Sequence, residues 1–261
     1  GPCIGNSECY IINYPMVSGI NKNSLANKII LITGASSGIG KTAAIRYASH
    51  GATVILLGKT LSKLEKVYDE IEKLDCPTPS ISLMDLLLAD ANDYQELIDN
   101  LLTEFNQLDG LLLNAAILGD RSPIEQYNVQ KWVETIHINL TSQFILVKTL
   151  LPALEKSDNA SVVFTSSGVG KIGKAFWGAY SVSKFGVEGL CQILAEEFNN
   201  DNSIRFNCIN PGAVRTKMRQ TAYPLENPED LPTPEKVMEK YLWLMSEASK
   251  NISGKSFDCQ Q

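Results

Sequence analysis

Short, uninterrupted apolar segments alternate with longer amphipathic segments along nearly the whole chain. The apolar segments, which we expect to form strands, are residues 28–33, 52–57, 80–85, 109–114, 160–166, 204–209 and 255–258. The amphipathic segments, which we expect to form helices, are residues 39–49, 61–74, 91–105, 125–155, 181–199 and 234–246. Continuously apolar strands separated by helices are typical of a parallel sheet that helices cover on both faces.

Parallel strands joined through helices need right-handed crossovers, which favours a doubly wound sheet. No internal repeat and no change of composition marks a second domain. The pattern therefore predicts the α/β class, with one domain over residues 28–261 built on a seven-stranded parallel sheet flanked by helices.

Two segments show no clear periodicity. Residues 1–27 are expected to form an N-terminal extension, in which Met16 is a candidate native start. Residues 213–233 contain three of the eleven prolines and follow a predicted strand. Because ligands of such sheets bind beyond the carboxyl ends of the strands, we expect residues 213–233, the lid segment, to cover a ligand cleft.

The composition excludes several classes of protein. The 261 residues include 23 basic and 29 acidic side chains, so the net charge of −6 gives no basic surface for nucleic acid. No apolar run approaches the ~18 residues of a membrane span, and no signal-peptide pattern is present, so we expect no membrane partner. The six cysteines form no C-x-x-C pair, which argues against a metal site and favours a reducing, cytoplasmic setting.

The first predicted strand runs directly into a glycine-rich turn, Thr33-Gly34-Ala35-Ser36-Ser37-Gly38-Ile39-Gly40, and then into a helix. Glycines permit a tight turn, a close approach of the backbone to a pyrophosphate, and close packing of the helix on the strand. The helix N-terminus adds unpaired N–H groups and the positive end of a dipole. The turn therefore predicts a binding site for the phosphates of a dinucleotide.

The spacing of this turn, Gly-x₃-Gly-x-Gly, resembles that of the short-chain dehydrogenase/reductase family in its compact, single-domain Rossmann form. Further motifs of that family follow in order: Asn114-Ala115-Ala116, Asn139 within HINLT, Ser167, Tyr180-x₃-Lys184, and Pro211-Gly212-x-Val214-x-Thr216. The segments ATVILLGK, WGAYSVSKF and YLWLM are similar to the YciK-type oxidoreductases, a bacterial branch of the family. Ala116 stands where the family usually has glycine, and Leu113 where it has its first asparagine.

Tyr180 and Lys184 stand four residues apart in a predicted helix, so their side chains share one face. A free phenol has a pKa of ~10 and is only about 0.1% ionised at pH 7. An ammonium at ~4 Å contributes about 4 kcal/mol at an effective dielectric constant of ~20, and desolvation of the phenolate opposes this effect. We expect a net lowering of the pKa of Tyr180, which makes Tyr180 the proton-transfer group.

The resemblance implies roles for the other motif residues. Ser167 is expected to polarise a substrate carbonyl, although its neighbour Ser166 is chemically equivalent and only the family spacing selects Ser167. Asn139 is expected to hold a water of a proton relay to Lys184. The implied cofactor-binding residues are Gly34, Ser36, Ser37, Gly38, Ile39, Gly40, Lys59, Asp85, Leu86, Asn114, Ala115, Tyr180, Lys184, Pro211, Gly212, Val214 and Thr216.

The end of the second predicted strand indicates which dinucleotide the site binds. Proteins that bind NAD carry Asp or Glu there, about 20 residues beyond the glycine turn, for the ribose 2′-hydroxyl. This chain has Gly58 at that place, followed by Lys59 and Thr60. Because a lysine attracts the 2′-phosphate that a carboxylate repels, Lys59, with the hydroxyls of Ser36 and Thr60, predicts NADP(H) in preference to NAD(H).

These observations predict an NADP-dependent oxidoreductase that transfers hydride between NADP(H) and a small carbonyl or alcohol substrate, with Tyr180 as general acid/base. The alternative is an NAD(P)-sensing regulatory protein on the same fold, which has no need of Tyr180, Lys184 and Ser167 together. The resemblance also implies a homodimer or homotetramer that pairs through the long fourth and fifth helices.

Overall fold

The sheet is parallel throughout, and its strand order confirms the doubly wound prediction. The computed structural model describes residues 21–200 and 203–260. Within these residues, seven strands lie in the order β3-β2-β1-β4-β5-β6-β7, and every neighbouring pair is parallel. The strands are β1 (Ile29–Thr33), β2 (Thr53–Gly58), β3 (Ser80–Leu83), β4 (Gly110–Leu113), β5 (Ala160–Thr165), β6 (Ile204–Asn210) and β7 (Ser256–Asp258). The order reverses between β1 and β4, where a crevice for ligands opens at the carboxyl ends of the strands.

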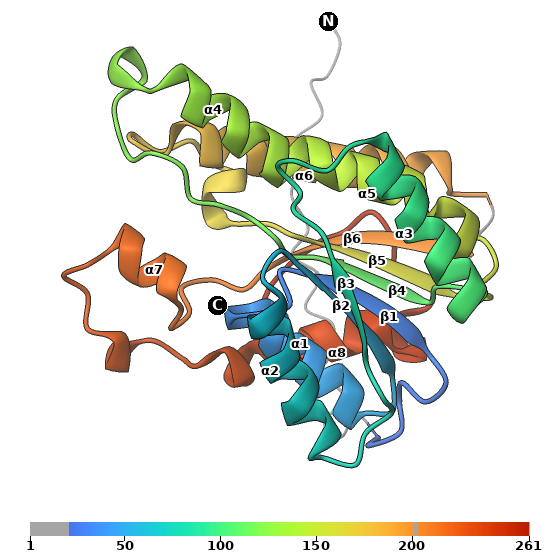
Figure 1. Ribbon diagram of the computed structural model, residues 1–261. Coiled ribbons are helices and arrows are strands. Elements are labelled where there is room, and N and C mark those ends of the chain that lie inside the picture. Colours follow the sequence, from blue (N-terminus) through green and yellow to red (C-terminus); the bar gives the residue numbers. More distant parts are fainter. Residues whose placement is uncertain (1–20, 201–202, 261) are drawn as a thin grey trace, which may run out of the picture.

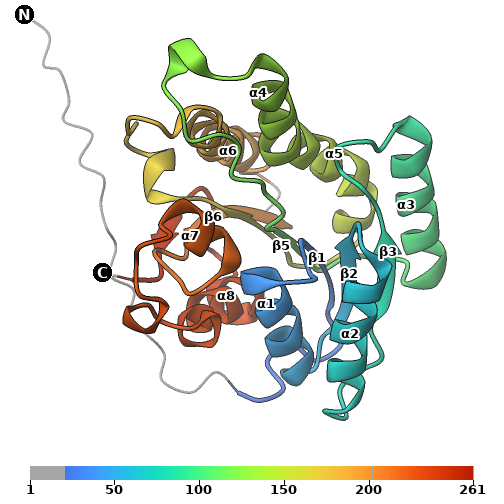
Figure 2. The same ribbon diagram turned by 60° about the vertical axis from the view of Figure 1, so that its left-hand side comes forward.

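Helices cover both faces of this sheet (Figure 1 and Figure 2). One face carries α1 (Gly38–Ser49), α2 (Leu61–Glu72) and α8 (Met238–Met245). The other face carries α3 (Ala91–Glu104), α4 (Val129–Ile136), α5 (Ser142–Leu154) and α6 (Gly178–Glu197). A short helix, α7 (Lys217–Ala222), lies apart from both layers. None of the helices described here has the length and apolar character needed to cross a membrane.

The alternation of side chains along a buried strand explains why each strand is apolar throughout. Ile30 and Ile32 of β1 lie in the core beneath α1 and α8, whereas Leu31 lies in the core on the opposite face. Leu25, which precedes β1, is fully buried in the first of these cores, and its N–H donates to the carbonyl of His50 at 3.0 Å. Part of the segment expected as an extension therefore packs on the domain, whereas the candidate start at Met16 lies outside the described residues.

Two segments differ in detail from their sequence patterns. The amphipathic stretch 125–155 is not one helix, because a π-helical turn, η2 (His137–Thr141), separates α4 from α5. The lid segment 213–233 contains α7, whose first turn is capped where the Thr216 hydroxyl accepts from the N–H of Arg219 at 3.2 Å. A helix of six residues is too short to produce a visible period in the sequence.

Candidate active site

The glycine turn between β1 and α1 has a backbone that only glycine adopts easily. Gly34 and Gly38 have φ angles of +63° and +55°, in the left-handed region. A Cβ atom at Gly40 would collide with the carbonyl oxygen of Gly34. Ser37, the residue before α1, makes no side-chain bond to the helix, and the first turn of α1 has no acidic residue. The hydroxyl of Ser37 and the first N–H groups of α1 therefore form a site suited to an anion.

Hydrogen bonds hold together the ends of the three central strands. The hydroxyl of Thr33 in β1 accepts from the N–H groups of Asn114 and Ala115, at 2.9 and 3.0 Å, just beyond β4. The side-chain oxygen of Asn114 accepts from the hydroxyl of Thr165, at the end of β5, at 3.0 Å. These contacts fix the floor of the crevice at the point where the strand order reverses.

Lys184 of α6 lies next to this floor, lines the cavity and is 3% exposed. Its ammonium donates a hydrogen bond to the backbone carbonyl of Thr165 at 2.9 Å. Burial lowers the pKa of Lys184 from 10.5 to about 8. The ammonium is therefore still mostly protonated at pH 7.

Tyr180 precedes Lys184 by one helical turn. Its pKa is shifted in the direction opposite to the one expected from the sequence. Burial raises the pKa of Tyr180, and a hydrogen bond with Ser167 lowers it by less. The Lys184 ammonium lies 5.6 Å from the centre of the phenol ring and donates to Thr165 instead. The expected net lowering of the pKa was therefore wrong, because desolvation of the phenolate outweighs the hydrogen bond with Ser167. The phenol is neutral at pH 7 and carries the proton that a general acid needs.

The two adjacent serines after β5 have different partners. The hydroxyl of Ser166 donates to Glu188 at 2.6 Å, and Glu188 also accepts from the hydroxyl of Ser256 at 2.9 Å. The hydroxyl of Ser167 accepts only a long bond from the N–H of Val169, at 3.4 Å, and contacts Tyr180. The sequence did not single out Glu188, although it follows Lys184 by four residues and thus shares its helix face.

Asn139 lies in the π-helical turn η2 and is fully buried. Its side-chain oxygen accepts from the N–H of Ile117 at 2.8 Å. Its amide donates to the carbonyl of Ile117 at 2.9 Å and to the hydroxyl of Ser183 at 3.2 Å. Both amide protons are therefore used, one by the loop after β4 and one by α6, which leaves Asn139 only acceptor positions for a water.

A cavity of about 780 Å³ joins these features. Of the residues expected from the sequence, Asn139 and Gly40 lie outside its lining. The others line it: Gly34, Ser36, Ser37, Gly38, Ile39, Lys59, Asp85, Leu86, Asn114, Ala115, Ser167, Tyr180, Lys184, Pro211, Gly212, Val214 and Thr216. The sequence missed several further lining residues, among them Lys41, Lys63, Leu118, Ile138, Lys217 and Met218, which no motif marks.

One end of the cavity is basic. Lys59, Thr60 and Lys63 line it next to Gly58, where β2 ends. Lys59 is exposed. The carboxylate in the lining nearest along the chain is Asp85, whose side chain accepts from the N–H of Leu87 at 2.9 Å. No carboxylate from β2 enters this end.

The other end is apolar and aromatic. Trp177, at the start of α6, is 7% exposed, lines the cavity and packs on Tyr180 with 5.5 Å between ring centroids. The guanidinium of Arg121 covers the Trp177 ring at 4.0 Å, and Tyr223 of the lid segment lies 6.0 Å from the same ring. Together with Leu118, these aromatic side chains form a wall beside Tyr180 that can contact the apolar part of a ligand.

Comparisons with known proteins agree with this geometry. A family model for short chain dehydrogenases matches residues 28–227. The chain is 46% identical over 236 residues to the uncharacterized oxidoreductase YciK of Escherichia coli strain K12, a match that covers 90% of this chain and 93% of YciK. A short chain dehydrogenase from Shigella flexneri, solved in complex with NADP, superposes with a TM-score of 0.90 at 45% identity, over 92% of this chain and 100% of that one. A short chain dehydrogenase from Escherichia coli CFT073, in complex with NADPH, superposes with a TM-score of 0.90 at 45% identity, over 93% of this chain and 100% of that one.

Proposed function

Since the chain belongs to the short-chain dehydrogenase family, we propose that it is an NADP(H)-dependent oxidoreductase that interconverts a carbonyl compound and its alcohol. The observation that carries the proposal is the arrangement at one end of the cavity. There the Tyr180 phenol contacts the Ser167 hydroxyl, one helical turn from the Lys184 ammonium. The same cavity continues to the glycine turn at its other end.

The residues at the glycine turn fit a dinucleotide. A Cβ atom at Gly34 would lie 3.0 Å from the Cα of Ala115, so the crevice between β1 and β4 has room only for glycine there. The Ser37 hydroxyl and the start of α1 offer donors to phosphate. When bound, the nicotinamide supplies or accepts the hydride.

In the direction of reduction, the protein's own residues handle the substrate oxygen. Ser167 donates a hydrogen bond to the carbonyl oxygen and polarises it. The neutral Tyr180 gives its proton to the same oxygen as negative charge develops there. The Lys184 ammonium, 5.6 Å from the centre of the Tyr180 ring, stabilises the resulting phenolate and would hold the nicotinamide ribose. In oxidation the proton moves in the opposite direction.

The basic end of the cavity supports NADP(H) over NAD(H). Gly58 leaves no carboxylate to accept from a ribose 2′-hydroxyl or to repel a 2′-phosphate. The exposed Lys59 and the hydroxyl of Thr60 line the same end. Lys59 therefore binds the 2′-phosphate.

The test is the oxidation of NADPH, followed by absorbance, with a panel of ketones and aldehydes. We expect turnover with at least one carbonyl compound, NADH to be a poorer reductant, and Tyr180→Phe to remove the activity. An NAD(P)-sensing protein would bind NADPH without oxidising it on any member of the panel. That result, or turnover that survives Tyr180→Phe unchanged, overturns the proposal.

A further inference from the structure

Three cations lie in the lid segment, and two of them are already paired within it. Arg219 bonds both carboxylate oxygens of Glu226 at 2.9 Å. Arg215 lies 3.6 Å from Glu229 and donates to two backbone carbonyls of the same segment. Lys217 is exposed, and its ammonium has no ion-pair partner within residues 21–200 and 203–260. Its charge is therefore available to a ligand.

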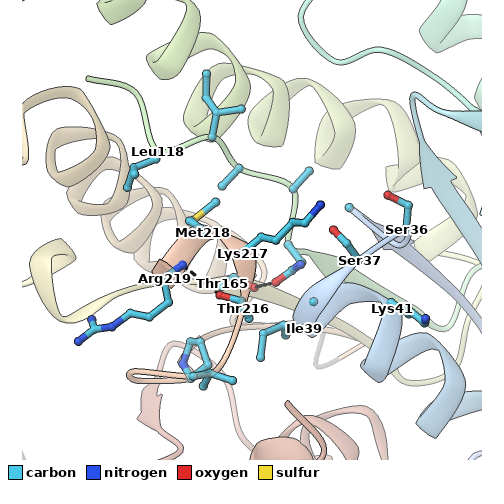
Figure 3. A pocket seen from close by; sticks show the side chains of 18 of the residues that line it. Ser36, Ser37, Ile39, Lys41, Leu118, Thr165, Thr216, Lys217, Met218 and Arg219 are labelled. Atoms are coloured by element: carbon cyan, nitrogen blue, oxygen red, sulfur yellow. Dashed lines mark hydrogen bonds between the residues drawn. The ribbon is translucent and has the colours of Figure 1, made fainter. Parts of the chain in front are cut away.

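Lys217 lines the cavity, as do Arg215 and Arg219, and it also borders a small pocket formed within the lid segment. Figure 3 shows its side chain extending from α7 into the cavity on the side of Ser37, whereas Arg219 points away. The residue before it, Thr216, lies against the glycine turn, because a Cβ atom at Gly38 would be 3.6 Å from the Thr216 methyl group. Lys217 thus faces the anion site from the side opposite α1.

The helix that carries Lys217 is anchored at its other end. The Arg121 guanidinium donates to the carbonyl of Ala222, the last residue of α7, at 2.9 Å. The same guanidinium contacts the rings of both Trp177 and Tyr223, at 4.0 and 5.5 Å from their centroids. Cation–π contacts of this kind hold an arginine in place without a carboxylate. Arg121 therefore keeps α7 over the cavity while Lys217 stays unpaired.

We propose that Lys217 binds the diphosphate of the dinucleotide from the lid side, opposite the glycine turn. This inference rests on the proposed function, because it assumes a pyridine dinucleotide in the cavity. The diphosphate carries two negative charges, and the N–H groups of α1 contact it from one side only. Lys217 supplies the compensating cation, so cofactor binding and the position of α7 over the substrate end are linked.

The test measures dissociation constants by ligand titration and needs no substrate. The three probes are NADPH, 2′-phospho-ADP-ribose, which lacks the nicotinamide, and adenosine 2′-monophosphate, which lacks both phosphates of the diphosphate bridge. The variants are Lys217→Gln, the conservative Lys217→Arg, and the matched control Lys236→Gln, which removes the same charge from an exposed lysine outside the cavity lining.

We expect Lys217→Gln to raise the dissociation constants of NADPH and 2′-phospho-ADP-ribose about tenfold, and that of adenosine 2′-monophosphate less than twofold. Lys217→Arg restores most of the affinity, and Lys236→Gln changes none of the three. Added salt should raise the dissociation constant of NADPH more steeply for the wild-type protein than for Lys217→Gln. An equal loss of affinity for all three probes, or no loss of affinity for any of them, overturns the inference. In the second case the charge of Lys217 remains available to an anionic substrate. A wild-type chain that binds none of the probes overturns the proposed function as well.

Discussion

The hydroxyl of Ser166 donates a hydrogen bond to the carboxylate of Glu188 at 2.6 Å. Ser166 is 2% exposed, so this bond commits its proton to the protein. Its neighbour Ser167 instead contacts the Tyr180 phenol at the cavity wall. Both serines line the cavity, and Glu188, on a different element, distinguishes them by binding the Ser166 hydroxyl; the proposed donor to a substrate is therefore Ser167.

We expect Ser167→Ala to lower kcat for carbonyl reduction about 100-fold, the effect of removing one donor to a developing oxyanion. Ser166→Ala should leave kcat within a few-fold and lower the free energy of unfolding by about 1–3 kcal/mol, because Glu188 loses a partner. Steady-state kinetics and denaturant unfolding of the two variants check both parts. An equal loss of kcat in the two variants would contradict the assignment.

Tyr180→Phe removes the proton donor and keeps the ring that packs on Trp177 at 5.5 Å. We expect kcat to fall by about 10²–10⁴, the contribution of general acid–base catalysis. The dissociation constant of NADPH should stay within a few-fold of wild type. Tyr68→Phe, at a partly buried tyrosine of α2 outside the cavity lining, is the control and should change neither quantity. A Tyr180→Phe enzyme with wild-type kcat would remove Tyr180 from the mechanism.

The sequence was sufficient to predict the sheet, the crevice and the glycine turn, which follow from short-range patterns along the chain. The continuous apolar strands required a sheet buried on both faces, and the β1–β4 crevice follows from parallel topology. The glycine turn was also predictable, because Gly34 and Gly38 have positive φ angles that make glycine necessary there. These features depend on neighbours within a few positions along the chain.

The features that the sequence did not predict depend on contacts between distant segments. Arg121 meets Trp177 and Tyr223 only through the fold. The partner of Ser166 lies on another helix, and the direction of the Tyr180 pKa depends on burial, which spacing does not reveal. The site's residues could thus be named from motifs, whereas their protonation states and partners could not.

The lowered pKa of Lys184 predicts a pH dependence. Below pH about 8 the lysine is a cation, and the ammonium is lost as the pH rises through that value. Tyr180, with its raised pKa, stays protonated over the same range. We therefore expect kcat/KM for reduction to be level near neutral pH and to fall about tenfold per unit above pH about 8. A profile that stays flat to pH ~10 would contradict the role of the Lys184 charge.

The lowered pKa of Lys184 also makes the free energy of unfolding depend on pH. The unfolded chain keeps Lys184 protonated up to its ordinary pKa of 10.5, whereas the folded chain loses the proton at about 8. Between these values the unfolded state binds more protons, so the Lys184 contribution to the free energy of unfolding increases with pH. Denaturant unfolding at several pH values should show this increase in wild type and its absence in Lys184→Met.

Exposed apolar side chains on one layer of helices predict self-association. Val133 of α4, Phe144 of α5, and Phe185 and Ile193 of α6 are each about half exposed. Apolar surface of this kind is typical of an interface between chains. We expect a homodimer or larger homo-oligomer in sedimentation experiments, and Phe144→Lys to shift it toward the monomer. Leu74→Lys, at an exposed leucine after α2, is the control and should leave the assembly unchanged.

The last prediction concerns the choice between NADP(H) and NAD(H). Lys59 is exposed at the end of the cavity where β2 stops, and no carboxylate of β2 or of the turn after it lines that end. Lys59→Ala should weaken NADPH binding by about 1.5 kcal/mol, the lower end of the range for a hydrogen bond to a charged group, and leave NADH nearly unchanged. Gly58→Asp should reverse the preference, because the carboxylate accepts from a 2′-hydroxyl and repels a 2′-phosphate. An added Cβ atom would lie 3.1 Å from a methyl carbon of the buried Leu64, so that side chain must shift by a few tenths of an ångström to admit the Cβ of the new aspartate. Titration of both dinucleotides, with Lys66→Ala as a charge-matched control on α2, checks the prediction. Equal weakening of NADPH and NADH by Lys59→Ala would show that Lys59 does not bind the 2′-phosphate.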